Sequence, residues 1–337
     1  MTVDPTLAVI WACILAGGLL IYVVLDGFDL GIGMLFGVAE SEHDRRVMMN
    51  SVAPIWDGNE TWLILGGAVL FAAFPSAYAI ALSAFYVPVM LLLFSLLFRG
   101  VAFEFRLKAR GTRRFWDAGF WVGSTTAAFA QGLLLGALID GVPLVDGRFH
   151  GGIWDWVSPF ALTTGLGVVG GYALLGATWL VMKTGGELQD WSRRAARAAL
   201  LITLLFLAVV SVYTPLRFPA VAERWFADGH WLMLSPVPLA TAVVAISLWR
   251  ELGHGAERMP FFFAVALFLL GYLGIGISIW PNILPPDLSL WEAAAPPASQ
   301  AFLLVAVALA LPMVLIYTAY AYWVFRGKAG DSGYGEH

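Results

Sequence analysis

Apolar runs of roughly 20 residues recur along the whole chain, and each is long enough to cross the ~30 Å hydrocarbon core of a bilayer as a helix. Only 12% of the residues are charged and 60% are hydrophobic, which is far from the composition of a soluble domain. The runs predict about nine transmembrane helices, at residues 7–31, 52–74, 78–98, 119–139, 159–182, 195–213, 231–249, 260–280 and 301–325. The expected fold is therefore an all-α integral membrane protein.

The connections between these runs are short, so we expect one polytopic membrane domain over residues 1–337. The first run has neither a basic segment before it nor a cleavage site after it, and is expected to remain as a helix. The basic residues are scattered in short connections and do not form a patch with interleaved aromatic residues. Membrane lipid is therefore an expected partner, and nucleic acid is not.

The basic residues are distributed unequally between the two sets of connections. One set contains Arg45, Arg46, the basic residues of 106–114 and 183–197, Arg250, Arg258, Arg326 and Lys328. The other set holds only Arg148, Arg217 and Arg224 of the 19 basic residues. Because cytoplasmic connections carry the excess of Lys and Arg, this asymmetry predicts a periplasmic N-terminus and a cytoplasmic C-terminus.

Two further patterns, of tryptophans and of glycines, predict where the helix ends meet the membrane surface and how closely the helices pack. Six tryptophans fall on the predicted outer side, where they indicate an interfacial belt: Trp154, Trp156, Trp225, Trp231, Trp280 and Trp291. Glycines spaced four apart allow close helix approach, at Gly27/Gly31, Gly33/Gly37, Gly132/Gly136 and Gly167/Gly171. These spacings favour a compact helix bundle or a subunit interface.

Charged residues lie inside or at the edge of the first three runs, where a carboxylate costs roughly 2.5 kcal/mol or more unless it is paired, hydrated or protonated. The pairs Asp26/Asp29 and Asp57/Glu60 are each three apart, so each pair shares a helix face. They are expected on the last turns of the first helix and the first turns of the second, with Arg99 and Glu104 ending the third at the same level. Three helix ends would then enclose a polar vestibule, in which Arg99 neutralises one carboxylate and the others relay protons. The alternative is a purely structural network.

The other reactive residues exclude several kinds of site. His43, His150, His230, His254 and His337 all fall in predicted loops or the tail, so no membrane helix offers the imidazole that usually ligates a buried haem. The single cysteine, Cys13, cannot form a disulfide within the chain or a cysteine metal cluster. No zinc-binding spacing or phosphate-binding loop is present. We therefore expect no metal, no cofactor bound by this chain and no catalysis by this chain alone.

Four segments and a fifth near the last helix resemble one family. They are 25–33 (LDGFDLGIG), 50–62 (NSVAPIWDGNETW), 71–75 (FAAFP), 99–106 (RGVAFEFR) and 291–300 (WEAAAPPASQ). The sequence resembles the second subunit of the cytochrome bd-type quinol oxidases. The likeness extends along the chain and includes the length and the nine-helix plan.

The resemblance implies a respiratory complex of the bacterial cytoplasmic (inner) membrane. Its haem-bearing subunit I carries the haems, b and d or b-type only, and the quinol site. This chain would be the haem-free partner, built of two four-helix bundles plus one extra helix. The complex would oxidise quinol, reduce dioxygen to water and draw protons from the cytoplasm without pumping. Small single-helix subunits and a structural quinone are compatible with the resemblance.

By motif position, Asp29 and Asp57 would belong to the cytoplasmic proton path, and Trp62 would lie near a dioxygen access route from the lipid. Asp26, Glu60, Arg99 and Glu104 join the proton path only through the vestibule argument. Glu60 follows Asn59 where some family members have glutamine. This difference is compatible with the cyanide-insensitive branch of the family.

Two alternatives come from other classes. A proton-coupled secondary transporter also buries carboxylates, but near the membrane midplane and with matching helix interruptions in its two halves. Here the charges are expected at helix ends, and the proline and glycine interruptions do not match. A structural anchor for the haem subunit would pair its acidic residues only internally. Replacement of Asp57 by asparagine separates a proton relay from an anchor.

Overall fold

The computed structural model describes residues 4–109 and 111–330, so Arg110 and His337 lie outside the described residues. Its long helices are α1 Pro5–Phe36, α3 Trp56–Ala73, α5 Tyr86–Lys108, α6 Arg113–Asp140, α7 Pro159–Lys183, α8 Gly186–Arg217, α11 Pro236–His254, α12 Met259–Ile279 and α14 Pro297–Val324. The shorter ones are α2 Glu42–Asn50, α4 Pro75–Ala84, α9 Pro219–Phe226, the 3₁₀ turn η1 Ala227–Gly229, α10 His230–Leu234 and α13 Leu290–Ala293. Two small hairpins, β1 Leu144–Val145 with β2 Arg148–Phe149 and β3 Asn282–Leu284 with β4 Leu288–Ser289, cover one end of the bundle.

Seven helices in the described part of the chain are long and apolar enough to cross a membrane, or up to nine if each of two bent pairs counts as one span. This confirms the prediction of a mostly helical integral membrane protein, to which the structure adds the two short hairpins. Two predicted runs are not continuous helices, however. The run at 78–98 is broken at Phe85, between α4 and α5, and the run at 231–249 is broken at Ser235. Pro236 begins α11 there, because proline fits the first turn of a helix but not its interior.

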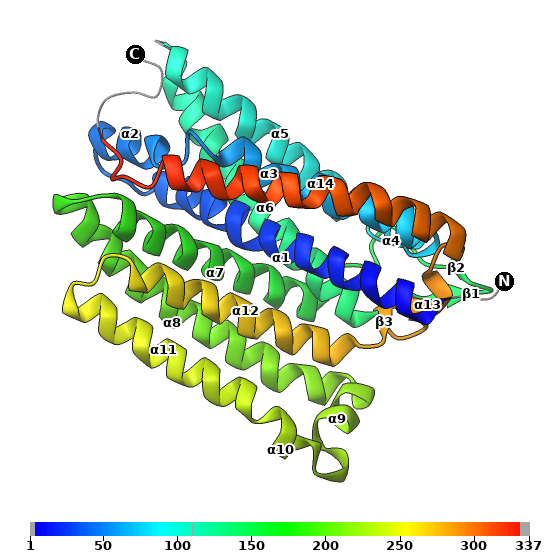
Figure 1. Cartoon of the computed structure of the whole chain (residues 1–337). Coiled ribbons are helices and arrows are strands. Elements are labelled where there is room, and N and C mark those ends of the chain that lie inside the picture. Colours follow the sequence, from blue (N-terminus) through cyan, green and yellow to red (C-terminus); the bar gives the residue numbers. More distant parts are fainter. Residues whose placement is uncertain (1–3, 110, 331–337) are drawn as a thin grey trace.

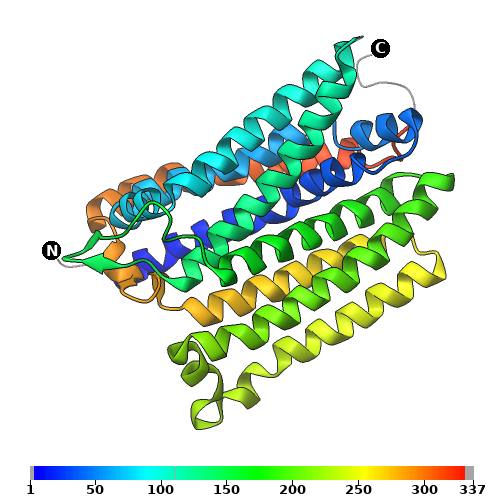
Figure 2. The ribbon, with the colours of Figure 1, turned by 180° about the vertical axis from the view of Figure 1, so that it is seen from behind.

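Helix α1 lies at the centre of the bundle (Figures 1 and 2). It packs against α3, α6 and α7, while α5 packs on α6. On the other side, α7 packs against α8 and α12, and α11 lies along α12 and α8. Helix α14 runs across the outside of α1 and α3, with most of its surface exposed.

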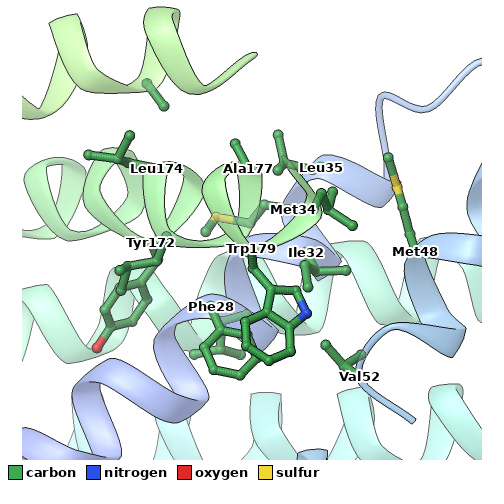
Figure 3. Packing of buried hydrophobic residues seen from close by; sticks show 14 of the residues in the cluster. Phe28, Ile32, Met34, Leu35, Met48, Val52, Tyr172, Leu174, Ala177 and Trp179 are labelled. Atoms are coloured by element: carbon green, nitrogen blue, oxygen red, sulfur yellow. The ribbon is translucent and has the colours of Figure 1, made fainter. Parts of the chain in front are cut away.

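Helices approach one another closely at several glycines, as the spacing of these residues predicted. A Cβ atom added at Gly31 of α1 would lie 1.9 Å from the backbone oxygen of Tyr172 in α7. One added at Gly132 of α6 would lie 2.6 Å from the Cα of Gly165. At these crossings only glycine allows the backbones to meet, so α1, α6 and α7 form a tightly packed centre. Phe28 and Trp179 stack at a centroid distance of 4.1 Å in the same region (Figure 3).

The two ends of the bundle differ in composition. We call the end with α2, the end of α5 and the start of α6 the basic end, because Arg45, Arg106 and Arg113 lie there. The opposite end carries the hairpins and the partly exposed Trp154, Trp231 and Trp280. The distribution agrees with the predicted belt of tryptophans, and which end faces the cytoplasm stays a prediction. Cys13 is exposed on α1.

Candidate functional site

A single buried arginine joins three helices inside the bundle. Arg99 of α5 is 1% exposed, and its Nη1 lies 2.9 Å from Asp26 Oδ1 and 3.4 Å from Glu60 Oε2. Its Nη2 lies 3.9 Å from Asp29 Oδ2. Asp26 and Asp29 come from α1, where both are fully buried, and Glu60 comes from α3. We call Asp26, Asp29, Glu60 and Arg99 the acid cluster.

The acid cluster lies deeper in the bundle than the sequence indicated. The last turns of the first helix were expected near Gly31, but α1 continues to Phe36, so Asp26 and Asp29 lie within the helix. Likewise α5 continues beyond Arg99 to Lys108. The expectation of helix ends was therefore wrong for α1 and α5, because buried apolar residues extend both helices past the charged positions. Asp26 and Asp29 do share one face, as their spacing of three requires.

Two of the six predicted vestibule residues stand apart. Asp57 lies in the first turn of α3 as expected, but its side chain is exposed on this chain. Glu104 is also exposed and is not among the ion-pair partners of Arg99. It follows Arg99 by five residues, which turns it well away from the cluster at 3.6 residues per turn. The structure thus brings together four of the six.

Asn59 contacts the cluster, Tyr322 contacts Asn59, and both were missed in the sequence. Asn59 donates from Nδ2 to Asp29 Oδ2 at 2.8 Å, and Tyr322 of α14 donates its hydroxyl to Asn59 Oδ1 at 2.8 Å. Asn59 lies in the segment 50–62 that carried the family resemblance, which is a signal that points to it. Tyr322 is one of several tyrosines in an apolar helix, and nothing in the sequence distinguishes it.

A second buried polar chain begins one helical turn before Asp26. Tyr172 of α7 donates its hydroxyl to Gln131 Oε1 at 2.6 Å, and Gln131 Nε2 donates to the Tyr22 hydroxyl at 2.9 Å. Tyr22 precedes Asp26 by four residues and lies on the same face of α1. The cluster therefore continues as polar contacts toward α6 and α7.

The charges of the acid cluster do not balance. Three carboxylates against one guanidinium give −3 + 1 = −2 when all are ionised. Asp26 Oδ2 and Asp29 Oδ1 are buried without a hydrogen-bond partner among the described residues. Since excess charge is costly in a buried site, binding protons relieves the imbalance. The arrangement can therefore hold protons and exchange them between neighbouring carboxyl groups.

A separate ion-pair network lies at the basic end. Arg106 was expected as a connection charge, but it is 1% exposed and donates to Asp117 Oδ1 at 2.5 Å and to Glu42 at 3.0 Å. Its guanidinium also lies 4.9 Å from the centre of the Phe36 ring. Arg113 pairs with the same Glu42 at 3.2 Å. These contacts connect α1, α2, α5 and α6.

Trp62 of α3 is 1% exposed, so a dioxygen route past it would run inside the protein and not along the surface of this chain.

The histidines within residues 4–109 and 111–330 lie at or near helix ends or in connections. His43 lies in the short helix α2, His150 in a connection, His230 at the start of α10 and His254 at the last residue of α11. None of these lies inside a long helix where a haem would need an imidazole.

Comparison with known proteins identifies the family. The sequence model described as cytochrome bd terminal oxidase subunit II matches residues 7–325. The chain is 34% identical over 357 residues to the cytochrome bd-I ubiquinol oxidase subunit 2 of Escherichia coli (strain K12), covering 94% of this chain and 93% of that relative. It is 29% identical over 334 residues to the cytochrome bd ubiquinol oxidase subunit 2 of Bacillus subtilis (strain 168), covering 95% and 96%.

The fold is also similar to that of a solved structure. A chain in the structure of the bd oxidase from Geobacillus thermodenitrificans is similar with a TM-score of 0.80 at 16% identity, covering 95% of this chain and 98% of that one. The resemblance noted in the sequence is thus confirmed by the family match and by the curated relatives. This chain belongs to the family of cytochrome bd terminal oxidase subunit II.

Proposed function

We propose that this chain is the haem-free second subunit of a bd-type terminal quinol oxidase in the cytoplasmic membrane of a bacterium. It pairs with a haem-bearing subunit I, and the complex oxidises quinol and reduces dioxygen to water, separating charge without pumping. The chain is not catalytic alone. Family membership supports this proposal, and so does the absence of the described histidines from the interiors of the long helices, since His254 is the last residue of α11.

We further propose the architecture that the helix contacts suggest. Helices α1, α3, α5 and α6 form one group of four, and α7, α8, α11 and α12 form a second. Helix α14 is the extra helix. The N-terminus is periplasmic, so the basic end faces the cytoplasm, in agreement with the distribution of Lys and Arg.

The acid cluster is proposed to take up protons from the cytoplasmic side. The observation that carries this proposal is Arg99, buried within 4 Å of three carboxylates that exceed it in charge. Asp57 lies one helical turn from Glu60 and is exposed, which suits a residue that receives protons from water. The proton path would run from Asp57 through Glu60 to Asp26 and Asp29.

Two predicted residues have weaker support. Trp62 is proposed to border an internal dioxygen route, and its support is a buried indole whose Nε1 has no hydrogen-bond partner among the described residues. Glu104 is proposed only as an outer acceptor of protons, because it is exposed and lies away from the cluster.

The test is turnover of the assembled complex, measured as quinol-dependent dioxygen uptake per haem. We expect Asp29→Asn to slow turnover by roughly 100-fold, the lower end of what a positioned proton-transfer group contributes. Asp57→Asn should give a smaller loss, since water can replace an exposed group. Asp190→Asn is the control, because Asp190 is an exposed acid at the start of α8, outside the cluster. Unchanged turnover in Asp29→Asn with intact haem content would leave only the structural anchor.

The competing function is proton-coupled transport. A transporter would be a colourless chain that purifies alone and intact from its native membranes. An oxidase subunit should purify with a haem-bearing partner, a reduced-minus-oxidised difference spectrum and oxidase activity. The cluster favours the oxidase, because it lies wholly on α1, α3 and α5 and has no counterpart among the buried charged residues described in α8, α11 and α12.

A further inference from the structure

Helix α14 contributes one hydroxyl group to the surroundings of the acid cluster. Tyr322 donates to Asn59 Oδ1 at 2.8 Å, and this leaves Asn59 Nδ2 to donate to Asp29 Oδ2 at 2.8 Å and to the Leu25 carbonyl at 3.4 Å. Asn59 is 1% exposed, so its amide has no water with which to exchange these partners freely. The ionised carboxylate and the Leu25 carbonyl only accept, so they face the amide N–H groups, and the Tyr322 hydroxyl donates to the amide oxygen at the other end.

Two aromatic rings and a chain segment hold Tyr322 in position. Its ring centroid lies 6.5 Å from Phe28 and 6.1 Å from Trp179, in edge-on contacts, and those two rings stack on each other (Figure 3). Beyond the helix, Lys183 Nζ donates to the carbonyls of Phe325 and Gly327 at 2.5 and 2.6 Å. The end of α14 is thus fastened to α7, although its outer face makes few contacts with the rest of the chain.

An amide and a hydroxyl can exchange donor and acceptor roles, and a guanidinium cannot. When Asp29 is ionised, the observed arrangement stabilises it, because Asn59 donates an N–H group to the carboxylate. When Asp29 takes up a proton, its O–H can donate to Asn59 Oδ1 once the amide turns over, and Nδ2 can then donate to the Tyr322 oxygen. In both states the buried amide keeps partners at both ends, and only Asp29 changes charge.

The other groups that face Asp29 do not have this property. They are Arg99 from α5, Asp26 from α1 and Glu60 from α3. Arg99 only donates, so it favours the ionised carboxylate alone, and the two acids carry the same charge as Asp29. Asn59 with Tyr322 is the neutral pair that can accommodate Asp29 with and without a proton.

We propose that Tyr322 is a positioning residue for Asp29, acting through Asn59 so that the buried carboxyl can load and release a proton without leaving the amide unpaired. This inference rests on the proposed function of the acid cluster. It adds a residue from the far end of the chain, on a helix whose other tyrosines Tyr317 and Tyr320 are exposed.

The test compares Tyr322→Phe with Tyr320→Phe in the full complex with intact haem content. Loss of one hydrogen bond should lower turnover by roughly two- to tenfold in Tyr322→Phe, whereas Tyr320→Phe, which changes an exposed hydroxyl two residues away, should be unaffected. The carboxyl band that Asp29→Asn removes from the infrared difference spectrum should also change frequency in Tyr322→Phe only. A general loss of structure would lower haem content and would not shift that one band.

A double variant tests whether Tyr322 acts through Asn59. If it does, adding Tyr322→Phe to Asn59→Leu should cause no further loss of turnover. Independent, multiplying losses would overturn the proposal, as would a Tyr322→Phe variant identical to Tyr320→Phe in rate and spectrum. If Asp29→Asn itself has full activity, the proposed proton function fails first, so the two failures can be told apart.

Discussion

Replacement of Arg99 by methionine should destabilise the assembled protein strongly. At 2.9 Å from Asp26 the attraction amounts to about 6 kcal/mol at an effective dielectric constant near 20. Desolvation of the guanidinium offsets part of this, and removal of one partner from a buried ion pair costs roughly 3–5 kcal/mol. The structure favours the upper end of that range, because three carboxylates lose their common cation.

The assay is the fraction of complex that stays assembled after heating in mild detergent, together with its haem spectrum. Arg99→Met should lose assembly at temperatures that leave the wild type intact, and Asp26→Asn added to it should restore part of the stability by removing one uncompensated charge. Arg194→Met is the matched control, since Arg194 is exposed at the start of α8. The reasoning is refuted if Arg99→Met is as heat-stable as Arg194→Met.

Three further predictions concern packing and the edges of the site. Gly31→Ala should sharply reduce the yield of assembled protein, because the new Cβ would lie 1.9 Å from the Tyr172 carbonyl oxygen. Gly17→Ala, whose Cβ would have nothing within 4 Å, should match the wild type in yield, and equal yields of the two variants would contradict this packing. Lys183→Met should make the segment after α14 more sensitive to limited proteolysis, since two carbonyls lose their donor, and an unchanged digestion pattern would count against this anchor. Glu104→Gln should change turnover by less than about twofold, as expected for an exposed side chain, and a loss like that of Asp29→Asn would show that the proton path was drawn wrongly.

The fold was largely predictable because hydrophobic length alone selects membrane helices. The break at Phe85 was missed, since a bend inside an apolar region leaves the hydropathy unchanged. The break at Ser235 was also missed, although Pro236 marks it in the sequence. The true ends of α1 and α5 were also missed. Apolar residues continue past Gly31 and the chain stays helical there because it packs on neighbouring helices, which a length rule does not include.

The site was predicted in part for a related reason. Charges in apolar runs are conspicuous, so Asp26, Asp29, Glu60 and Arg99 could be found and correctly grouped. Neutral polar residues such as Asn59 and Tyr322 do not stand out in an apolar run as charged residues do. Their hydrogen bond forms only in the fold, where α3 and α14 meet. The sequence also does not show which charged side chains are exposed, so Asp57 and Glu104 were grouped with residues that the structure buries.

We propose that the acid cluster delivers protons to the oxidase from the basic end of the bundle. The most direct measurement is proton uptake during a single turnover of the complex in sealed vesicles, followed with a pH indicator on the side of the basic end. In Asp29→Asn, with normal haem content, proton uptake and dioxygen reduction should slow together while binding of quinol is unchanged. Uptake at the wild-type rate would contradict the account.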